Sequence, residues 1–354
     1  MKTGNKKLWI LLIVLGIASV VAIQVARHFF RDEERQIRTH IRETVKNEYP
    51  EIVERLNSSY GLRPFEQGEL SVTHDAQTTE VILIHGLDEP GKVWMNLAPA
   101  LVREGFSVWI MTYPNDQPIT ESAQFFVKQL HAHNGSGAGS ISIVAHSMGG
   151  LVAREMLTDP ALSYFERADN GELPVVEQLI MVGTPNHGSA LAQFRFFTEI
   201  RDQWTNLFKG NYHWLHGIID GAGEAGIDLI PDSKFLQELN SRPHPDNVDM
   251  LVIAGEMSQG QRNDIEKLAR DLEGKLSEDT RDDVKQMENL LLEASQQVGD
   301  GLVSVYSARL PGVPFMIVQG THLSMIRNIK PDSLRIPPAV PIIVEELDQS
   351  IASN

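Results

Sequence analysis

The chain of 354 residues is 42% hydrophobic and contains no cysteine, which excludes disulfides, thiolate metal sites and a cysteine nucleophile. Its formal net charge of −16 is unevenly distributed. Residues 1–31 contain five basic side chains and no acidic one, whereas the rest carries 26 basic and 47 acidic side chains, a net charge of −21. Such an acidic body repels nucleic-acid phosphates, so we expect no nucleic-acid partner.

The segment 8–26 is an uncharged, mostly apolar run of 19 residues. As a helix it would match the roughly 30 Å hydrocarbon core of a bilayer, and the lysines before it favour a cytoplasmic N-terminus. We therefore predict a cytoplasmic stub and single-pass membrane anchor over residues 1–26, with the rest of the chain on the periplasmic or extracellular side. The alternative is a cleaved signal peptide and a secreted protein, although such apolar regions usually span only about 7–15 residues.

Residues 27–69 are predicted to form an amphipathic juxtamembrane helix followed by a linker. Apolar side chains at Ile37, Ile41 and Val45 recur at helical spacing within a strongly charged stretch, and Pro50 favours a break.

From residue 70 to residue 354, short apolar runs alternate with helical patterns, which predicts a mostly parallel sheet with helices on both faces. The runs are continuously apolar, as is typical of buried parallel strands. The predicted strands are Val81–Ile84, Ser107–Met111, Ile141–Ala145, Gln178–Val182, Met250–Ala254 and Phe315–Val318. The predicted helices are Val93–Glu104, Glu121–His131 and Gly150–Leu157.

Two segments interrupt this alternation. Residues 190–245 are rich in phenylalanine, and we expect them to form a helical cap over the site. Residues 257–299 are strongly charged and place apolar residues at helical spacing, which predicts a helical insertion.

The strongest local motif surrounds Ser147. The strand Ile141–Ala145 runs into Ala145-His-Ser-Met-Gly149, and a helical pattern follows directly. A strand, a sharp turn and a helix around A-x-S-x-G form a nucleophile elbow, which exposes the serine at the strand end. Ala145 replaces the usual first glycine, and it is the smallest side chain that could do so. Ser147 is therefore the candidate nucleophile.

A second motif, His85-Gly86-Leu87, follows the strand Val81–Ile84. Ester hydrolysis creates an oxyanion that needs preorganised donors, and a glycine at a strand end allows a close backbone approach. The expected oxyanion hole is the N–H of Leu87 together with the N–H of Met148.

A serine nucleophile needs a histidine base and an orienting acid, which follow it in the order acid then histidine in this architecture. His322 comes just after the last predicted strand and is the candidate base. For the acid we favour Asp300, which lies in a turn-like Gly-Asp-Gly-Leu-Val sequence, over Glu256, which directly follows a strand. The weaker candidates are the histidines His187, His213, His216 and His244 and the aspartates Asp220 and Asp228.

Together these motifs resemble the bacterial lipase and esterase branch of the α/β-hydrolase superfamily. The matching segments, in order, are His85–Leu87, Ala145–Gly150, Gly183–Ser189, Asp300–Val303 and Thr321–His322. The segment Pro231–Asn240 is also similar to inositol deacylase-like hydrolases. The resemblance implies the α/β-hydrolase fold, supports Asp300 as the acid, and implies catalysis without a cofactor. Many secreted relatives bind calcium through an aspartate shortly after the histidine, but Leu323–Ile326 contains none, so we expect no metal.

We therefore expect hydrolysis of a carboxylic ester, of a lipid or another acyl compound, through Ser147, His322 and Asp300. The same residues would also serve an acyltransferase or a thioesterase. A membrane-tethered binding module without turnover is the alternative from another class, since a fold does not fix function. The sequence specifies no protein partner.

Overall fold

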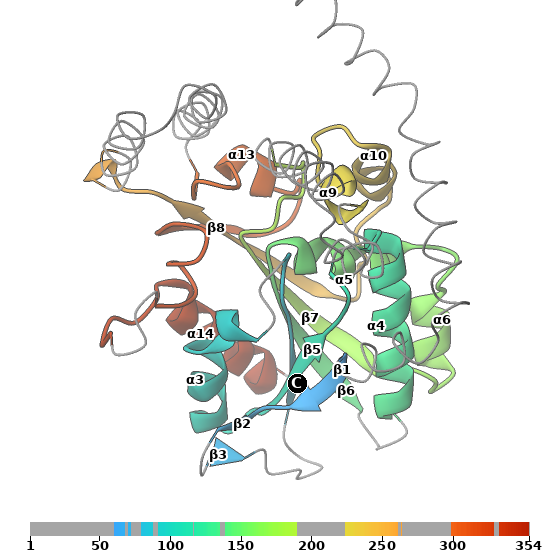
Figure 1. Ribbon diagram of the computed structural model, residues 1–354. Coiled ribbons are helices and arrows are strands. Elements are labelled where there is room, and N and C mark those ends of the chain that lie inside the picture. The colour runs from blue at the N-terminus through green and yellow to red at the C-terminus, as the bar shows by residue number, and fades with distance from the viewer. Residues whose placement is uncertain are drawn as a thin grey trace, which may run out of the picture.

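The computed structural model describes residues 60–67, 70–71, 79–87, 91–115, 117–134, 139–189, 224–260, 263, 299–328 and 333–353. Within these residues the chain forms one large sheet with helices on both of its faces (Figure 1). This architecture is the mostly parallel α/β arrangement that the sequence predicts.

The large sheet has the strand order β1-β5-β4-β6-β7-β8-β9, and every neighbouring pair is parallel except β1 with β5. All six predicted strands are present, each extended by one to three residues. Their bounds are β4 Glu80–Ile84, β5 Ser107–Thr112, β6 Ser140–His146, β7 Val175–Val182, β8 Asp249–Glu256 and β9 Phe315–Gln319. Side chains of the central strands are almost fully buried, which explains their continuous apolar sequences.

The sheet begins earlier in the chain than we expected. The sequence predicts a linker up to residue 69, but Gly61–Pro64 forms strand β1, which pairs antiparallel with β5 at the edge of the sheet. Pro64 lies at the last position of this edge strand, where a missing N–H is tolerated. A separate two-stranded ribbon pairs β2 (Glu66–Gln67) with β3 (Leu70–Ser71).

Two groups of helices cover the two faces of the sheet (Figure 1). Helices α4 (Ile119–Asn134), α5 (Met148–Thr158) and α6 (Tyr164–Asp169) bury side chains against one face. Helices α3 (Leu97–Arg103) and α14 (Ala339–Ser353) pack on the other, beside the short 3-10 turn η1 (Lys92–Trp94). The predicted helix over 93–104 is therefore broken into η1 and α3.

Three further short helices are α9 (Glu224–Asp228), α10 (Lys234–Ser241) and α13 (Val305–Ala308). The first two fall within the segment 190–245 that the sequence predicts to be a cap, and residues 190–223 of that segment lie outside the described residues. Nearly all of the insertion 257–299, the whole segment 8–26 and the part of the predicted juxtamembrane helix before residue 60 also lie outside them. Among the helices that the structure describes, none combines the length and apolar character needed to cross a bilayer.

The strand order places a topological switch point at the carboxyl ends of β4 and β6. The chain leaves β4 toward β5 on one side, and the next strand, β6, pairs with β4 on the other side. Loops diverge at such a point and leave room for a ligand. His85-Gly86 follows β4 and Ser147 follows β6, so both sequence motifs meet at this edge.

Candidate active site

Ser147 occupies the turn between β6 and α5 in a strained backbone conformation, with φ 54° and ψ −130°. A positive φ in a non-glycine residue costs about 1–3 kcal/mol and persists only where the surroundings enforce it. Here the Ser147 N–H donates to the Val182 carbonyl at 2.8 Å, and α5 begins at the next residue. This geometry is the strand, sharp turn and helix that the sequence predicts around the candidate nucleophile.

The small residues around the turn are required by close backbone approaches. A methyl group at Gly149 would lie 2.5 Å from the Ile84 carbonyl oxygen, and one at Gly86 would lie 2.6 Å from Cβ of Ser147. Real Cβ atoms essentially never approach so closely. The two glycines therefore allow the end of β4 to pack directly against the serine.

Asp300 and His322 contact each other in the buried interior of the site. Nδ1 of His322 donates to Oδ2 of Asp300 at 2.8 Å, and the two side chains are only 8% and 1% exposed. The other carboxylate oxygen, Oδ1, accepts from the N–H groups of Leu302 at 2.9 Å and Val303 at 2.7 Å. The Asp-Gly-Leu-Val turn thus fixes the carboxylate, and the carboxylate in turn fixes the imidazole.

Ser147 and His322 both lie close to one short backbone segment, Val182–Gly183. Ser147 bonds to the Val182 carbonyl, and a methyl group on the next residue, Gly183, would lie 3.1 Å from Cε1 of His322. Within the described residues no hydrogen bond joins the Ser147 hydroxyl to the imidazole. Catalytic hydrogen bonds are often long in unliganded enzymes, so this arrangement is compatible with a nucleophile and its base.

The two expected oxyanion donors, the N–H groups of Leu87 and Met148, belong to segments that adjoin Ser147. Met148 is the first residue of α5, where an N–H has no acceptor within the helix. Leu87 follows the Gly86 that packs on Ser147. Among the residues that the structure describes, neither N–H donates a hydrogen bond.

His146, which precedes the serine, packs against His322 with ring centroids 4.7 Å apart. Its Nε2 donates to the His322 carbonyl at 3.0 Å, whereas Nδ1 is buried without a partner among the described residues. Burial, reinforced by the neighbouring His322, holds the pKa of His146 well below its usual value. The ring is therefore neutral at neutral pH and supports His322 without adding charge.

Four of the other candidate residues, Asp228, His187, His244 and Glu256, lie in the described part of the chain. Asp228 is buried and accepts from the Ile119 N–H at the start of α4, which is a structural role. His187 lies against the Arg309 carbonyl, and His244 bonds to the backbone of Pro311. Glu256 ends β8, where its carbonyl accepts from the Gly320 N–H. Asp220, His213 and His216 lie outside the described residues.

The Gly183–Ser189 motif carries a buried polar network. The Asn186 side chain donates to the Ala308 carbonyl at 2.7 Å and accepts from Arg154 at 2.9 Å. Arg154 also donates to Asn240 on α10. Because an unpaired buried polar group is costly, this network ties α5, α10 and α13 together around the loop that packs on His322.

Three residues at the site were not singled out by sequence reasoning: His146, Tyr113 and Asn115. Tyr113 directly follows β5 and Asn115 lies two residues further on, and the end of β5 lies beside the end of β4. Their signal is positional, since polar residues after neighbouring parallel strands meet at one edge of the sheet.

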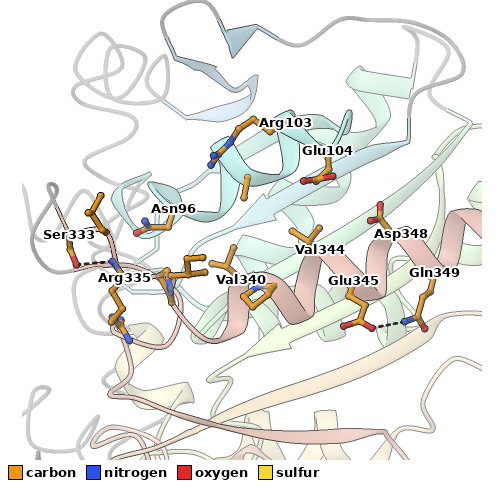
Figure 2. A pocket seen from close by; sticks show the side chains of 15 residues that line it. Asn96, Arg103, Glu104, Ser333, Arg335, Val340, Val344, Glu345, Asp348 and Gln349 are labelled. Atoms are coloured by element: carbon orange, nitrogen blue, oxygen red, sulfur yellow. Dashed lines mark hydrogen bonds between the residues drawn. The ribbon is translucent and has the colours of Figure 1, made fainter.

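A metal ion, or a ligand away from Ser147, would need a site of its own among the described residues. In the described part of the chain no cluster of three or more histidines and acidic residues could hold a metal ion. A groove of about 1030 Å³ lies between α3, α14 and residues 333–337, and Figure 2 shows Arg103, Val340 and Val344 among its lining. This groove lies on the sheet face opposite α5 and contains none of the proposed site residues.

One family model, described as a domain of unknown function (DUF7379), matches residues 116–299. Comparison with curated proteins gives no match.

Several solved structures share the fold. The mature Bacillus licheniformis lipase BlEst2 has a TM-score of 0.51 at 17% identity, over 80% of this chain and 97% of that one. The Staphylococcus hyicus lipase has a TM-score of 0.51 at 14% identity, over 82% and 99% of the two chains. The Legionella pneumophila phospholipase PlaB has a TM-score of 0.50 at 15% identity, over 78% and 61%. The chain therefore has the α/β-hydrolase fold, with structural similarity to bacterial lipases and esterases.

The depressed pKa of His146 predicts an acid-sensitive fold. In the unfolded chain its pKa is about 6.5, so below that pH the unfolded state binds a proton that the folded state does not. The free energy of unfolding therefore decreases as the pH is lowered below that value, by up to about 1.4 kcal/mol per pH unit for this group. We expect His146→Gln, which keeps an N–H donor, to weaken the pH dependence of urea denaturation between about pH 6.5 and 5.

The control is His131→Gln, which removes an exposed histidine whose ring bonds to the Glu172 carbonyl. The same change of slope in both variants, or none in His146→Gln, would contradict the prediction.

Proposed function

We propose that this chain, which belongs to the DUF7379 family, hydrolyses carboxylic esters of lipids or other acyl compounds with Ser147 as the nucleophile. The observation that carries the proposal is the buried hydrogen bond between His322 and Asp300, beside the strained turn that presents Ser147. A nucleophile, a histidine base and an oriented acid are the three groups that serine-dependent acyl transfer requires.

The proposed reaction has two halves. The Ser147 hydroxyl attacks the acyl carbonyl carbon while Nε2 of His322 takes its proton, and the carbonyl oxygen becomes an oxyanion bound by the N–H groups of Leu87 and Met148. The tetrahedral intermediate then expels the alcohol, which receives the proton from His322, and leaves an acyl-enzyme. In the second half, water gives a proton to Nε2 of His322 as its oxygen bonds to the acyl carbon. The bond from that carbon to Oγ of Ser147 then breaks, Oγ takes the proton back from His322, and the carboxylic acid leaves.

Asp300 has an orienting role in this scheme. Because its carboxylate accepts a hydrogen bond from Nδ1 of His322, the neutral imidazole carries its proton there and presents a bare Nε2. The same carboxylate stabilises the imidazolium that forms when Ser147 is deprotonated.

The similar solved structures and the net charge of the chain both support an acyl ester as the substrate. The similar structures named above are two lipases and a phospholipase. The net negative charge of the body suits a neutral or apolar substrate better than a polyanion.

The location that we propose rests on residues 8–26, which we infer to anchor the chain in a membrane with the catalytic domain on the exported side. Tethering would raise the effective concentration of the enzyme at lipids or exported esters.

Ser147→Ala should reduce ester hydrolysis by at least about 10⁴-fold, because it removes the nucleophile while deleting one oxygen atom. His322→Ala should have a similar effect, and the double variant should lose little more, since these residues act as a unit. The measurement is the initial rate on p-nitrophenyl esters from acetate to dodecanoate.

Ser163→Ala is the matched control, because Ser163 also has a positive φ, of 45°, but lies at the exposed start of α6. Full activity in Ser147→Ala would refute the mechanism.

Asp300→Asn should lower kcat by up to about 10⁴-fold, because an amide in place of the carboxylate disturbs the imidazole tautomer. Glu256→Gln, which changes the competing acid at the end of β8, should have a much smaller effect. Measuring kcat for both variants decides between the two acids, and the reverse result would assign the role to Glu256.

The anchor is tested by fractionating cells and sequencing the N-terminus of the mature protein. An intact segment 8–26 in protein released only by detergent is the expected result. A protein that is soluble without detergent and begins between about residues 23 and 32 would indicate a cleaved signal peptide. The catalytic proposal would be unaffected.

A further inference from the structure

The carbonyl of Gly86, next to Ser147, accepts hydrogen bonds from two side chains. Nδ1 of His85 donates to it at 2.7 Å, and the Asn115 side-chain amide donates at 3.2 Å. Burial lowers the pKa of His85 to about 4, so the ring is neutral at neutral pH and its single N–H must lie on Nδ1 to make this bond. Two donors on one carbonyl restrict rotation of the peptide that contains it.

That peptide also contains the N–H of Leu87. In a planar trans peptide the C=O and the N–H point in opposite directions, and the described residues contain no cis peptide. Holding the Gly86 oxygen toward Asn115 therefore holds the Leu87 N–H away from Asn115.

The preceding peptide is held from the same strand end. The Tyr113 hydroxyl donates to the His85 carbonyl at 2.7 Å, and the two rings stack with centroids 4.8 Å apart. Both side chains are fully buried. Residues that follow β5 thus brace two successive carbonyls of the segment that follows β4, and Gly86 at its centre packs on Ser147.

We propose that Asn115 is a positioning residue for the oxyanion hole: together with His85 it fixes the Gly86–Leu87 peptide so that the Leu87 N–H points at the oxygen of an acyl group bound to Ser147. The inference rests on the proposed function, because it assigns the orientation of one of that reaction's two donors. Its physical basis is preorganisation, since a donor that is already aligned pays no reorganisation cost when the oxyanion forms.

This role predicts a selective loss in the transition state. Without the Asn115 donor the peptide is held by His85 alone, and the Leu87 N–H samples orientations that do not reach the oxyanion. Losing a whole oxyanion donor costs about 10²–10³-fold in kcat, so a poorly aimed one should cost about 10–100-fold. The ester ground state carries little charge on this oxygen, so KM should change by less than about twofold.

The experiment compares Asn115→Ala and Asn115→Asp with the wild-type chain. The first variant removes the donor, and the second keeps its shape but cannot donate. For each we would measure kcat and KM on a short-chain ester and the inhibition constant of a trifluoromethyl ketone, whose adduct with Ser147 places an oxyanion in the hole. Both variants should lose ketone affinity by about the factor lost in kcat/KM.

Asn96→Ala is the matched control. Asn96 is also half-buried and makes one hydrogen bond to the backbone, from the Asn328 N–H at 2.7 Å, but it lies beside α3 on the other face of the sheet. Rates are expressed per active serine titrated with a fluorophosphonate, so that misfolded protein does not count. Two results for Asn115→Ala would overturn the positioning role alone. One is a set of kinetic constants equal to those of the wild-type chain, and the other is a raised KM with unchanged kcat and ketone affinity. An inactive wild-type chain would overturn both this inference and the proposed function.

Discussion

The left-handed backbone at Ser147 is the constraint to which the surrounding sequence is fitted. A serine at this φ is strained by about 1–3 kcal/mol. The strain is offset by what the turn connects, a fully paired central strand and a helix whose residues are almost all buried. It also forces the end of β4 and the start of α5 into contact, so that Gly86 and Gly149 cannot carry side chains. The need for glycine at both of these positions, which are far apart in the sequence, thus follows from the backbone conformation of one residue, Ser147.

Buried polar groups at the site are satisfied unequally, and the pattern follows the proposed roles. Both oxygens of Asp300 have partners, so the carboxylate is held in one orientation. His85 and His146, by contrast, each bury a ring nitrogen that lacks a partner in the described part of the chain. Each also donates its one proton to a carbonyl beside a residue of the proposed site. An incompletely satisfied histidine costs stability, and at both positions that cost accompanies the alignment of a backbone segment of the proposed site.

The parts of the fold that could be predicted are those encoded locally. Each central strand is a continuous apolar run, and the elbow is a short motif between two such elements. Strand β1 could not be predicted, because Gly61–Pro64 has no apolar run and exists only through pairing with the distant β5. The packing of helix α14 on the sheet could not be predicted either, because its residues are apolar but form no recognisable motif. The broken helix near Asn96 likewise depends on tertiary contacts rather than on periodicity.

The residues of the proposed site also divide into those that the sequence predicts and those that depend on the pairing of distant strands. Ser147, Asp300 and His322 could be proposed because chain order and flanking strands restrict where such residues fall. Asn115 could not, since its relation to Gly86 arises only where β5 pairs with β4, and asparagine after a strand is common in turns. The hydrogen bond between His322 and Asp300 similarly joins two loops whose approach depends on β9 pairing with β8.

The match to DUF7379 has a structural consequence of its own. The matched segment, residues 116–299, contains Ser147 and the strands β6, β7 and β8, but it ends one residue before Asp300 and excludes β4, β5 and β9. His85, Gly86, Asn115 and His322 all follow the excluded strands. The turn that contains Ser147 lies within the matched segment, but the segment contains neither the proposed base His322, nor the proposed acid Asp300, nor Leu87. The proposed chemistry therefore requires residues 80–322, from β4 to the turn after β9, because residues that follow β4, β5 and β9 meet the turn that follows β6 at the centre of the sheet.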